Sequence, residues 1–184
     1  MFLPRIQLFA LIAIFILTTD FAQATTAKNP ATQLGTVSFP TSGTGQAQQH
    51  FLRGVAALHS FWYTEALDAF QQSTEADPQF AMGYWGTAMA HNHGLWEEQE
   101  NQLANAALAK IPDTLNLTQR EQDYIHAVRL LYGDGRKPMR DKAYSKAMEK
   151  IYRTYPADLE AAWAEGARLV TLVGPAGVGK TQLA

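Results

Sequence analysis

The sequence predicts an all-α protein whose middle part is a series of amphipathic helices packed as antiparallel pairs. Three observations favour this fold class. Residues 47–167 are rich in alanine and studded with aromatic residues, and no strand-like alternation of apolar and polar residues occurs there. Breaks that contain proline, glycine or short polar runs divide this region into helix-sized pieces. We expect these breaks at residues 61–63, 77–78, 91–96, 112–118, 133–138 and 155–157.

The composition limits the function classes. The chain has 184 residues, with 15 lysines and arginines against 17 aspartates and glutamates, which gives a formal net charge of −2. This length suits one domain with a real core. The near-neutral balance argues against a strongly basic nucleic-acid binder. The absence of cysteine excludes disulfides, thiolate catalysis and thiolate-bound metal sites.

Residues 1–24 have the order of parts typical of a secretory signal peptide. Arg5 supplies a positive start, Leu8–Leu17 is an unbroken apolar run, and Ala22-Gln23-Ala24 has the small-x-small pattern of a cleavage site. The segment predicts a periplasmic or secreted protein. An alternative stays open, in which the segment is not cleaved and residues 6–19 anchor the chain in a membrane.

Residues 25–46 are rich in Thr, Ser, Gly and Pro and have no helical period. They predict an extended linker, with at most a short strand at residues 36–39. Further on, Thr64 is expected to cap a helix that begins at Glu65. Thr118 followed by Glu121 predicts a capping box at the start of another helix.

Four residues of the first helix pair have a characteristic spacing. Gly54, Ala66, Phe70 and Pro78 are separated by 12, 4 and 8 residues. A small residue on each helix permits a close crossing, Phe70 fills the space beside it, and Pro78 ends the second helix. With this spacing, residues 47–80 resemble one complete tetratricopeptide repeat, whose period is 34 residues. Residues 47–162 as a whole resemble bacterial tetratricopeptide-repeat proteins, with two further degenerate repeats; an unrelated helical bundle is the alternative.

The resemblance implies a solenoid of antiparallel helix pairs whose concave face binds a protein or peptide partner. The first helix of each pair would line this face. Projecting the 34-residue period gives the candidate partner-binding residues Phe51, Val55, His59, Trp85, Met89, Asn92 and His93. His59 and His93 are 34 residues apart, so they are expected side by side on adjacent first helices.

The histidines allow three interpretations. They can bond the neighbouring turn, contact a partner or ligand, or take part in metal binding or catalysis. A metal site needs a third ligand, and none is placed by the repeat register. His91 and His93 would point apart on one helix unless the helix ends between them. Because no nucleophile–base pair is found either, we expect no catalytic residue, no metal site and no cofactor.

The last residues carry a different motif. Leu169–Val173 is a short apolar run suited to a buried strand, and the next eight residues fit the phosphate-binding pattern G-x-x-x-x-G-K-T. The candidate nucleotide-binding residues are Gly174, Gly177, Gly179, Lys180 and Thr181. The motif resembles the Walker A start of bacterial multidomain signal-transduction ATPases. Residues 163–184 are therefore expected to be a truncated strand–P-loop fragment, joined to the helical part near residues 161–165.

The leading functional hypothesis is an exported, non-enzymatic helical-repeat scaffold that binds a protein or peptide through its concave face. The near-neutral charge favours a protein over a nucleic acid as partner. The alternative is the N-terminal part of a P-loop ATPase with an appended repeat region. Only that alternative would require ATP and magnesium, bound through Gly174–Thr181.

Overall fold

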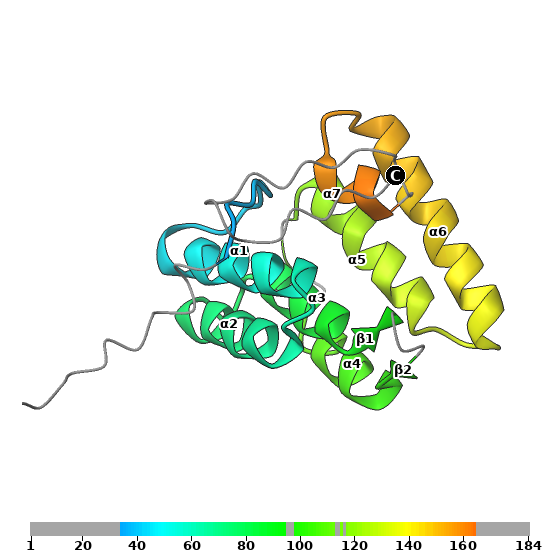
Figure 1. Ribbon diagram of the computed structural model, residues 1–184, viewed down its shortest axis with the longest axis horizontal. Coiled ribbons are helices and arrows are strands. Elements are labelled where there is room, and N and C mark those ends of the chain that lie inside the picture. The colour runs from blue at the N-terminus through cyan, green and yellow to red at the C-terminus, as the bar shows by residue number, and fades with distance from the viewer. Residues whose placement is uncertain (1–33, 95–97, 113–114, 116, 165–184) are drawn as a thin grey trace, which may run out of the picture.

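The computed structural model describes residues 34–94, 98–112, 115 and 117–164 (Figure 1). These residues form seven α-helices and one two-stranded hairpin, so the predicted helical character of the middle region is confirmed. The helices are α1 (Gly45–His59), α2 (Tyr63–Ala76), α3 (Ala81–Ala90), α4 (Asn101–Leu108), α5 (Gln119–Leu131), α6 (Lys137–Thr154) and α7 (Leu159–Ala164), and the strands are β1 (Asn92–His93) and β2 (Glu98–Gln99).

All six predicted breaks separate consecutive helices. The antiparallel hairpin of β1 and β2 fills the break between α3 and α4, and the sequence does not predict it. The predicted signal peptide at residues 1–24 and the P-loop residues 174–181 lie outside the described residues.

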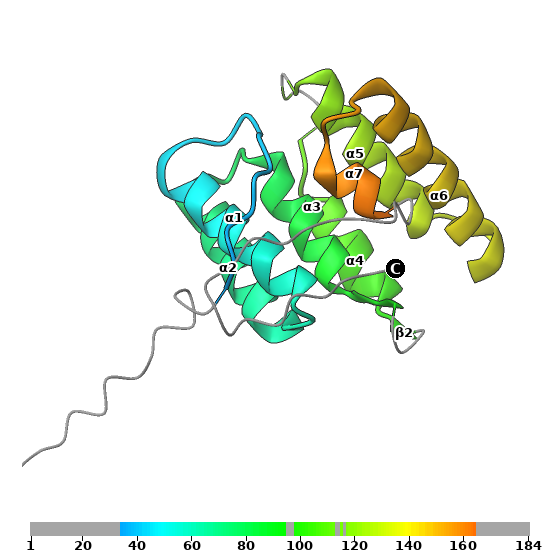
Figure 2. The ribbon, with the colours of Figure 1, turned by 45° about the horizontal axis from the view of Figure 1, so that its top comes forward.

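The helices pack in the order of the chain. α1 lies on α2, α2 on α3, α3 on α4, α5 on α6, and α6 on α7. α3 also contacts both α1 and α5. Helices α1, α3 and α5 therefore form one side of the molecule, which we call the odd-helix face (Figures 1 and 2).

The close crossing predicted for the first helix pair is present. A Cβ atom at Gly54 would lie 2.6 Å from Cε1 of Phe70, and Ala66 and Phe70 are both fully buried. Gly86 of α3 approaches the same ring, because a Cβ there would lie 2.3 Å from Phe70 Cε1. The Phe70 ring thus fits between α1 and α3 only because both helices present a glycine to it.

Local signals explain most helix boundaries. Thr118 forms the predicted capping box with Glu121 at the start of α5. Pro138 lies in the first turn of α6, where a missing N–H costs nothing. The predicted cap by Thr64 is wrong, because α2 begins at Tyr63 and Thr64 lies inside its first turn.

The segment before α1, residues 34–44, contains no helix or strand, and we call it the strap. The sequence predicts this lack of regular structure but not the packing of the segment. Phe39 is only 2% exposed and Leu34 only 8%, because the strap lies against the helices. The short strand considered for residues 36–39 is absent, and α1 begins two residues earlier than the predicted start at residue 47.

Within the described ranges, no helix combines the length and the apolar character that crossing a membrane requires.

We predict that Gly86→Ala lowers the free energy of unfolding by about 1–3 kcal/mol, because the added methyl group overlaps the Phe70 ring. Urea unfolding followed by circular dichroism measures the change. Gly94→Ala is the matched control, since a Cβ there meets only Asn92 Nδ2 at 3.8 Å. Equal stability of both variants would contradict the proposed role of the glycine.

Candidate functional site

Three aromatic rings, one from each helix of the odd-helix face, surround the side chain of Phe39. Its ring centroid lies 5.3 Å from that of Phe51 in α1, 5.5 Å from that of Trp85 in α3 and 5.1 Å from that of Tyr124 in α5. The Trp85 and Tyr124 rings meet it edge to face, the geometry that aromatic quadrupoles favour. We call the space between Phe51, Trp85 and Tyr124 the aromatic slot.

Polar side chains of α1 and α5 hold the backbone of the strap on either side of the slot. Gln48 Nε2 donates to the Phe39 carbonyl oxygen at 3.0 Å, and Arg120 Nη1 donates to the carbonyl oxygen of Pro40 at 2.7 Å. The backbone N–H and the hydroxyl group of Ser42 both donate to Glu121 Oε1, each at 2.7 Å. The strap is therefore bound through its backbone as well as through one aromatic side chain.

Arg120 connects the strap to the C-terminal end of the described chain. Its guanidinium group lies 4.4 Å from the ring centroid of Phe39 and 4.9 Å from that of Tyr124. Its Nε donates to Asp158 Oδ2 at 2.7 Å, and the Asp158 side chain is only 5% exposed. Because this carboxylate fixes the planar guanidinium, Arg120 can contact the Phe39 ring and the Pro40 carbonyl at the same time.

The buried carboxylate of Glu121 accepts hydrogen bonds both from the residue before α5 and from the strap. Oε2 accepts from the backbone N–H of Thr118 at 3.0 Å and from its hydroxyl group at 2.8 Å, while Oε1 accepts the two bonds from Ser42. Burial alone would raise the pKa of this group, but the bonds from Ser42 and Thr118 outweigh it and lower the pKa. The same side chain thus begins α5 and holds the strap.

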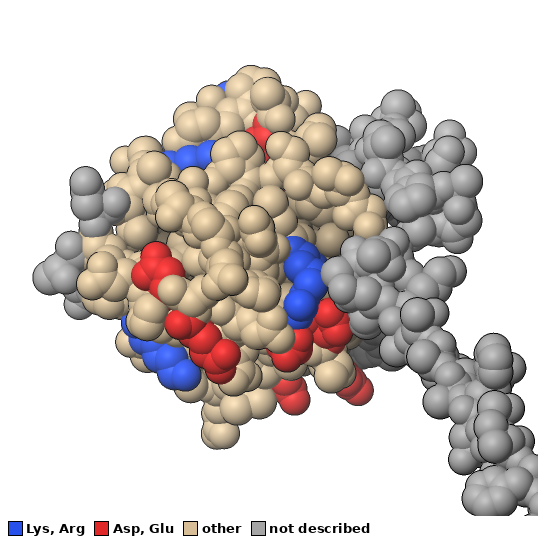
Figure 3. Space-filling model, turned by 90° about the vertical axis from the view of Figure 1, so that its left-hand side faces the viewer, with Lys and Arg blue, Asp and Glu red and all other residues tan. Residues whose placement is uncertain are grey.

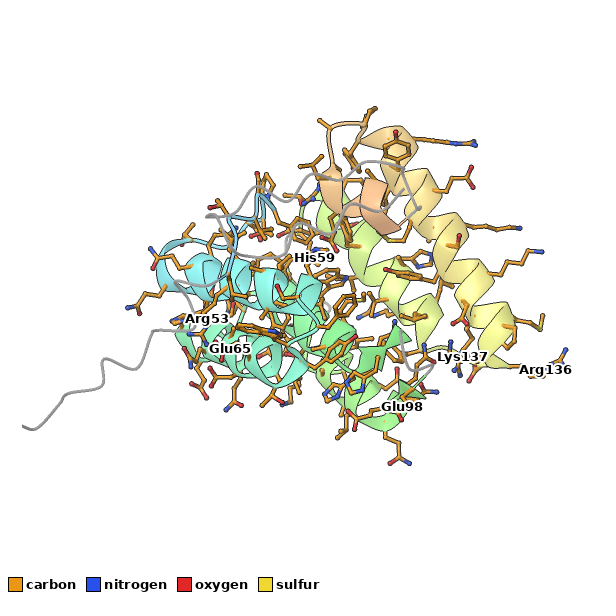
Figure 4. The ribbon with its side chains drawn as sticks, in the orientation of Figure 1. Arg53, His59, Glu65, Glu98, Arg136 and Lys137 are labelled. Carbon is orange, nitrogen blue, oxygen red and sulfur yellow. The ribbon has the colours of Figure 1, made fainter. Side chains whose placement is uncertain are left out.

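His59, at the end of α1, pairs with Glu160 of α7. Their Nε2 and Oε2 atoms lie 2.7 Å apart, and both side chains are nearly buried, with 10% and 9% exposed (Figure 4). Burial would lower the pKa of His59, but the charge and the hydrogen bond of Glu160 raise it above its ordinary value. Burial and the negative charges of Asp158 and Glu160 raise the pKa of neighbouring Tyr124 far above its usual range.

His91 and His93 lie at the hairpin of β1 and β2 and have separate partners. His91 Nδ1 lies 2.6 Å from Glu100 Oε2. His93 stacks on Tyr63 with ring centroids 4.2 Å apart, and its Nδ1 lies 3.7 Å from an oxygen of Glu98, which Figure 4 shows at the hairpin. In the described part of the chain, no group of three or more His, Cys, Asp or Glu side chains is arranged to hold a metal ion.

The seven candidate partner-binding residues divide into two groups. The structure buries Phe51, Val55 and Trp85 completely or almost so in the core. Because these side chains are buried, the interpretation as an open binding surface does not hold for these three in this conformation. Four others are partly exposed: His59, Met89, Asn92 and His93.

His59 and His93 do not act as one pair in this arrangement. His59 faces Glu160 of α7, whereas His93 belongs to the hairpin with Tyr63 and Glu98. Asn92 accepts a hydrogen bond from Gln99 Nε2 at 2.9 Å across the two strands. α3 ends at Ala90, His91 is its C-cap in a turn and His93 lies in β1, so these two residues are not on one helix.

Sequence reasoning misses the strap contacts, namely those of Phe39, Arg120 and Glu121. Phe39 stands in a segment of linker composition, and Arg120 follows an ordinary helix start. The sequence contains one signal: Phe39 is the only aromatic residue among residues 25–46 and stands directly before a proline. Such an isolated aromatic residue indicates a contact with the body of the protein.

The side of the molecule that lies at the left in Figure 1 carries no patch of one charge among the described residues. In Figure 3 basic and acidic side chains are interspersed there, and most of the surface is uncharged. Arg53 of α1 contributes to this pattern by pairing with Glu65 and Asp68 of α2, at 3.3 and 2.6 Å.

Comparison of the chain with protein-family models, with curated proteins and with solved structures finds no match. The candidate site is therefore assigned from its own geometry: an aromatic slot, a set of polar groups that bind backbone atoms, and a strap that occupies both.

We predict that Glu121→Gln lowers the free energy of unfolding by about 2–3 kcal/mol, because the charged acceptor of four hydrogen bonds is lost. Because the folded-state pKa of Glu121 is lowered, this stabilisation is complete at pH values above the ordinary carboxyl pKa. It is lost as the pH falls through the folded-state pKa. Urea unfolding between pH 3 and pH 7 should show the difference from wild type shrinking in acid. The control Glu75→Gln, on an exposed part of α2, should stay within about 0.5 kcal/mol of wild type.

We predict that the His59–Glu160 pair stabilises the fold in acid more than in base. The folded-state pKa of His59 is raised, so the contribution is complete below pH 6.5, the ordinary histidine value, and is lost as the pH rises through the folded-state pKa. The stability difference between wild type and Glu160→Gln, measured from pH 5.5 to pH 9, should decrease with increasing pH. Glu98→Gln, whose carboxylate is 73% exposed, is the control. A difference that is constant over this range would show that the pair carries no charge.

Proposed function

We propose that the protein is an exported helical-repeat scaffold that binds a non-helical segment of a protein or peptide partner on its odd-helix face. In this proposal the helix pairs stack like tetratricopeptide repeats, and α1, α3 and α5 are the first helices that line the concave side. The order of helix contacts, α1 with α3 and α3 with α5, supports this arrangement. Export rests on the signal-like residues 1–24.

The single observation that carries the proposal is the way in which the strap is held. A buried segment needs hydrogen-bond partners for its backbone, and these can come from its own chain neighbours or from side chains of distant helices. Here three side chains, Gln48, Arg120 and Glu121, bind backbone atoms of the strap, and a ring of aromatic residues binds Phe39. Backbone hydrogen bonds combined with one side-chain slot are the usual means by which proteins recognise short peptide segments.

The strap is connected to α1 and therefore competes with any partner for this face. A tethered segment has an effective concentration in the order of millimolar, so a partner has to bind well to replace it. Weakening the strap should therefore increase partner binding, although it removes contacts from the protein itself.

We predict that Phe39→Ala makes the face available to a peptide. A labelled peptide with the sequence of residues 34–44, LGTVSFPTSGT, should bind the full-length variant with a dissociation constant in the micromolar range. Binding to the wild-type chain should be at least about tenfold weaker, because its own strap competes. Fluorescence anisotropy measures both affinities, and circular dichroism verifies that the helices are intact.

Ser42→Pro provides a second route to the same state, since it removes both donors to Glu121, the N–H and the hydroxyl group, at a position outside the helices. Met139→Ala, on an exposed position of α6, should bind the peptide as weakly as wild type does. The proposal is wrong if neither strap variant binds the peptide while both keep their helical content.

A further inference from the structure

The aromatic slot is built to accept a planar ring. Phe39 is 2% exposed, and its ring meets those of Trp85 and Tyr124 at interplanar angles of 77° and 64°. The Arg120 guanidinium group lies over the same ring at 4.4 Å. An aliphatic side chain could fill the volume, but it would lose the edge-to-face contacts and the cation–π attraction, each worth roughly 0.5–1.5 kcal/mol.

The position after the ring suits a proline. The Arg120 guanidinium group has a fixed orientation here, because its Nε donates to Asp158 while its Nη1 donates to the Pro40 carbonyl oxygen. Proline keeps that strong acceptor, has no N–H group that would need a partner, and is already restricted in φ. A segment with proline here therefore loses less conformational entropy when it binds.

Two positions after the proline, the site binds a side-chain hydroxyl group. Glu121 Oε1 accepts from both the N–H and the Oγ of Ser42 at 2.7 Å. Threonine presents the same two donors, whereas alanine leaves the carboxylate with one bond fewer. The three contacts together define an aromatic residue, a proline and, two positions later, serine or threonine; Thr41, which stands between the last two in the strap, donates its hydroxyl group to Gln48 Oε1.

A polar atom of the slot residues has no hydrogen-bond partner in the strap. The indole Nε1 of Trp85 is buried and, among the described residues, has no hydrogen-bond acceptor, although Trp85 is only 1% exposed. A buried donor without an acceptor costs roughly 1–3 kcal/mol. A partner segment with an acceptor within reach of this atom would gain an interaction that the strap lacks.

We propose that the partner presents a non-helical segment with an aromatic residue followed by proline and, two positions later, serine or threonine, and that this segment replaces the strap in the aromatic slot. This inference rests on the proposed function and names the chemistry of its ligand. The strap then acts as an internal copy of the partner segment and keeps the slot closed until the partner arrives.

The test compares four peptides on the full-length Phe39→Ala chain by fluorescence anisotropy. The reference peptide has the sequence of residues 34–44, and the others replace the position of Phe39 by leucine, that of Pro40 by alanine or that of Ser42 by alanine. We expect the affinity to fall at least about tenfold for the leucine peptide and about three- to tenfold for each alanine peptide. The Ser42→Pro chain repeats the comparison in a second background.

A second measurement assigns the selectivity to the slot. Arg120→Gln removes the cation above the ring, so the ratio between the affinities for the phenylalanine and leucine peptides should decrease several-fold. The control is Arg136→Gln, on the residue before α6 that Figure 4 shows at the far end of the molecule, and it should leave the ratio unchanged.

The possible failures are distinguishable. If no peptide binds either strap variant, the proposed function itself is wrong. If all four peptides bind equally well, the face binds peptides but the aromatic–proline specificity is overturned. If only the leucine peptide is weaker, the aromatic anchor is supported and the assignment of the proline and serine positions is overturned.

Discussion

The packing of Phe39 against the rings of Phe51, Trp85 and Tyr124 is the interaction that joins the strap to the helices. The three rings come from α1, α3 and α5, so one side chain contacts all three helices of the odd-helix face at once. The strap is thus part of the core, and side chains of α1 and α5 also bind its backbone through hydrogen bonds.

Two neighbouring charged residues at the start of α5 make this arrangement possible. Arg120 and Glu121 are both largely buried, which costs free energy unless each charge is well compensated. Asp158 compensates Arg120, and four hydrogen bonds compensate Glu121. Because part of this compensation comes from the strap and part from the turn before α7, the two ends of the described chain are linked through the first turn of α5.

The helices could be predicted because their signals are local. The capping box of Thr118 and Glu121, the proline after α2 and the glycines after α5 each act within a few residues. The close approach at Gly54 could also be predicted, because its spacing to Phe70 follows from the repeat pattern. The predicted cap at Thr64 is wrong because a threonine can either cap a helix or lie in its first turn. The backbone conformation decides between these two positions.

The site could be predicted only in part, since its contacts join distant residues. Ser42 binds a carboxylate 79 residues away, and His59 binds one 101 residues away. The 34-residue period predicts Phe51 and Trp85 as residues of an open partner-binding face, whereas the structure buries both, and the period cannot show that a segment of linker composition packs on them. The hairpin escaped prediction because strands of two residues are too short to give an alternating pattern.

Hydrogen exchange at the backbone amide of Ser42 tests the central claim most directly, because this amide donates to buried Glu121 only while the strap occupies the face. The wild-type chain, isotopically labelled, is measured by nuclear magnetic resonance with and without an excess of the unlabelled strap peptide. If the strap is a replaceable ligand, exchange at Ser42 should become at least about tenfold faster at saturating peptide, while the amides in the middle of α5 keep their protection. Unchanged exchange at Ser42 with the peptide bound would show that the strap is a fixed part of the core and that the odd-helix face is not the binding site.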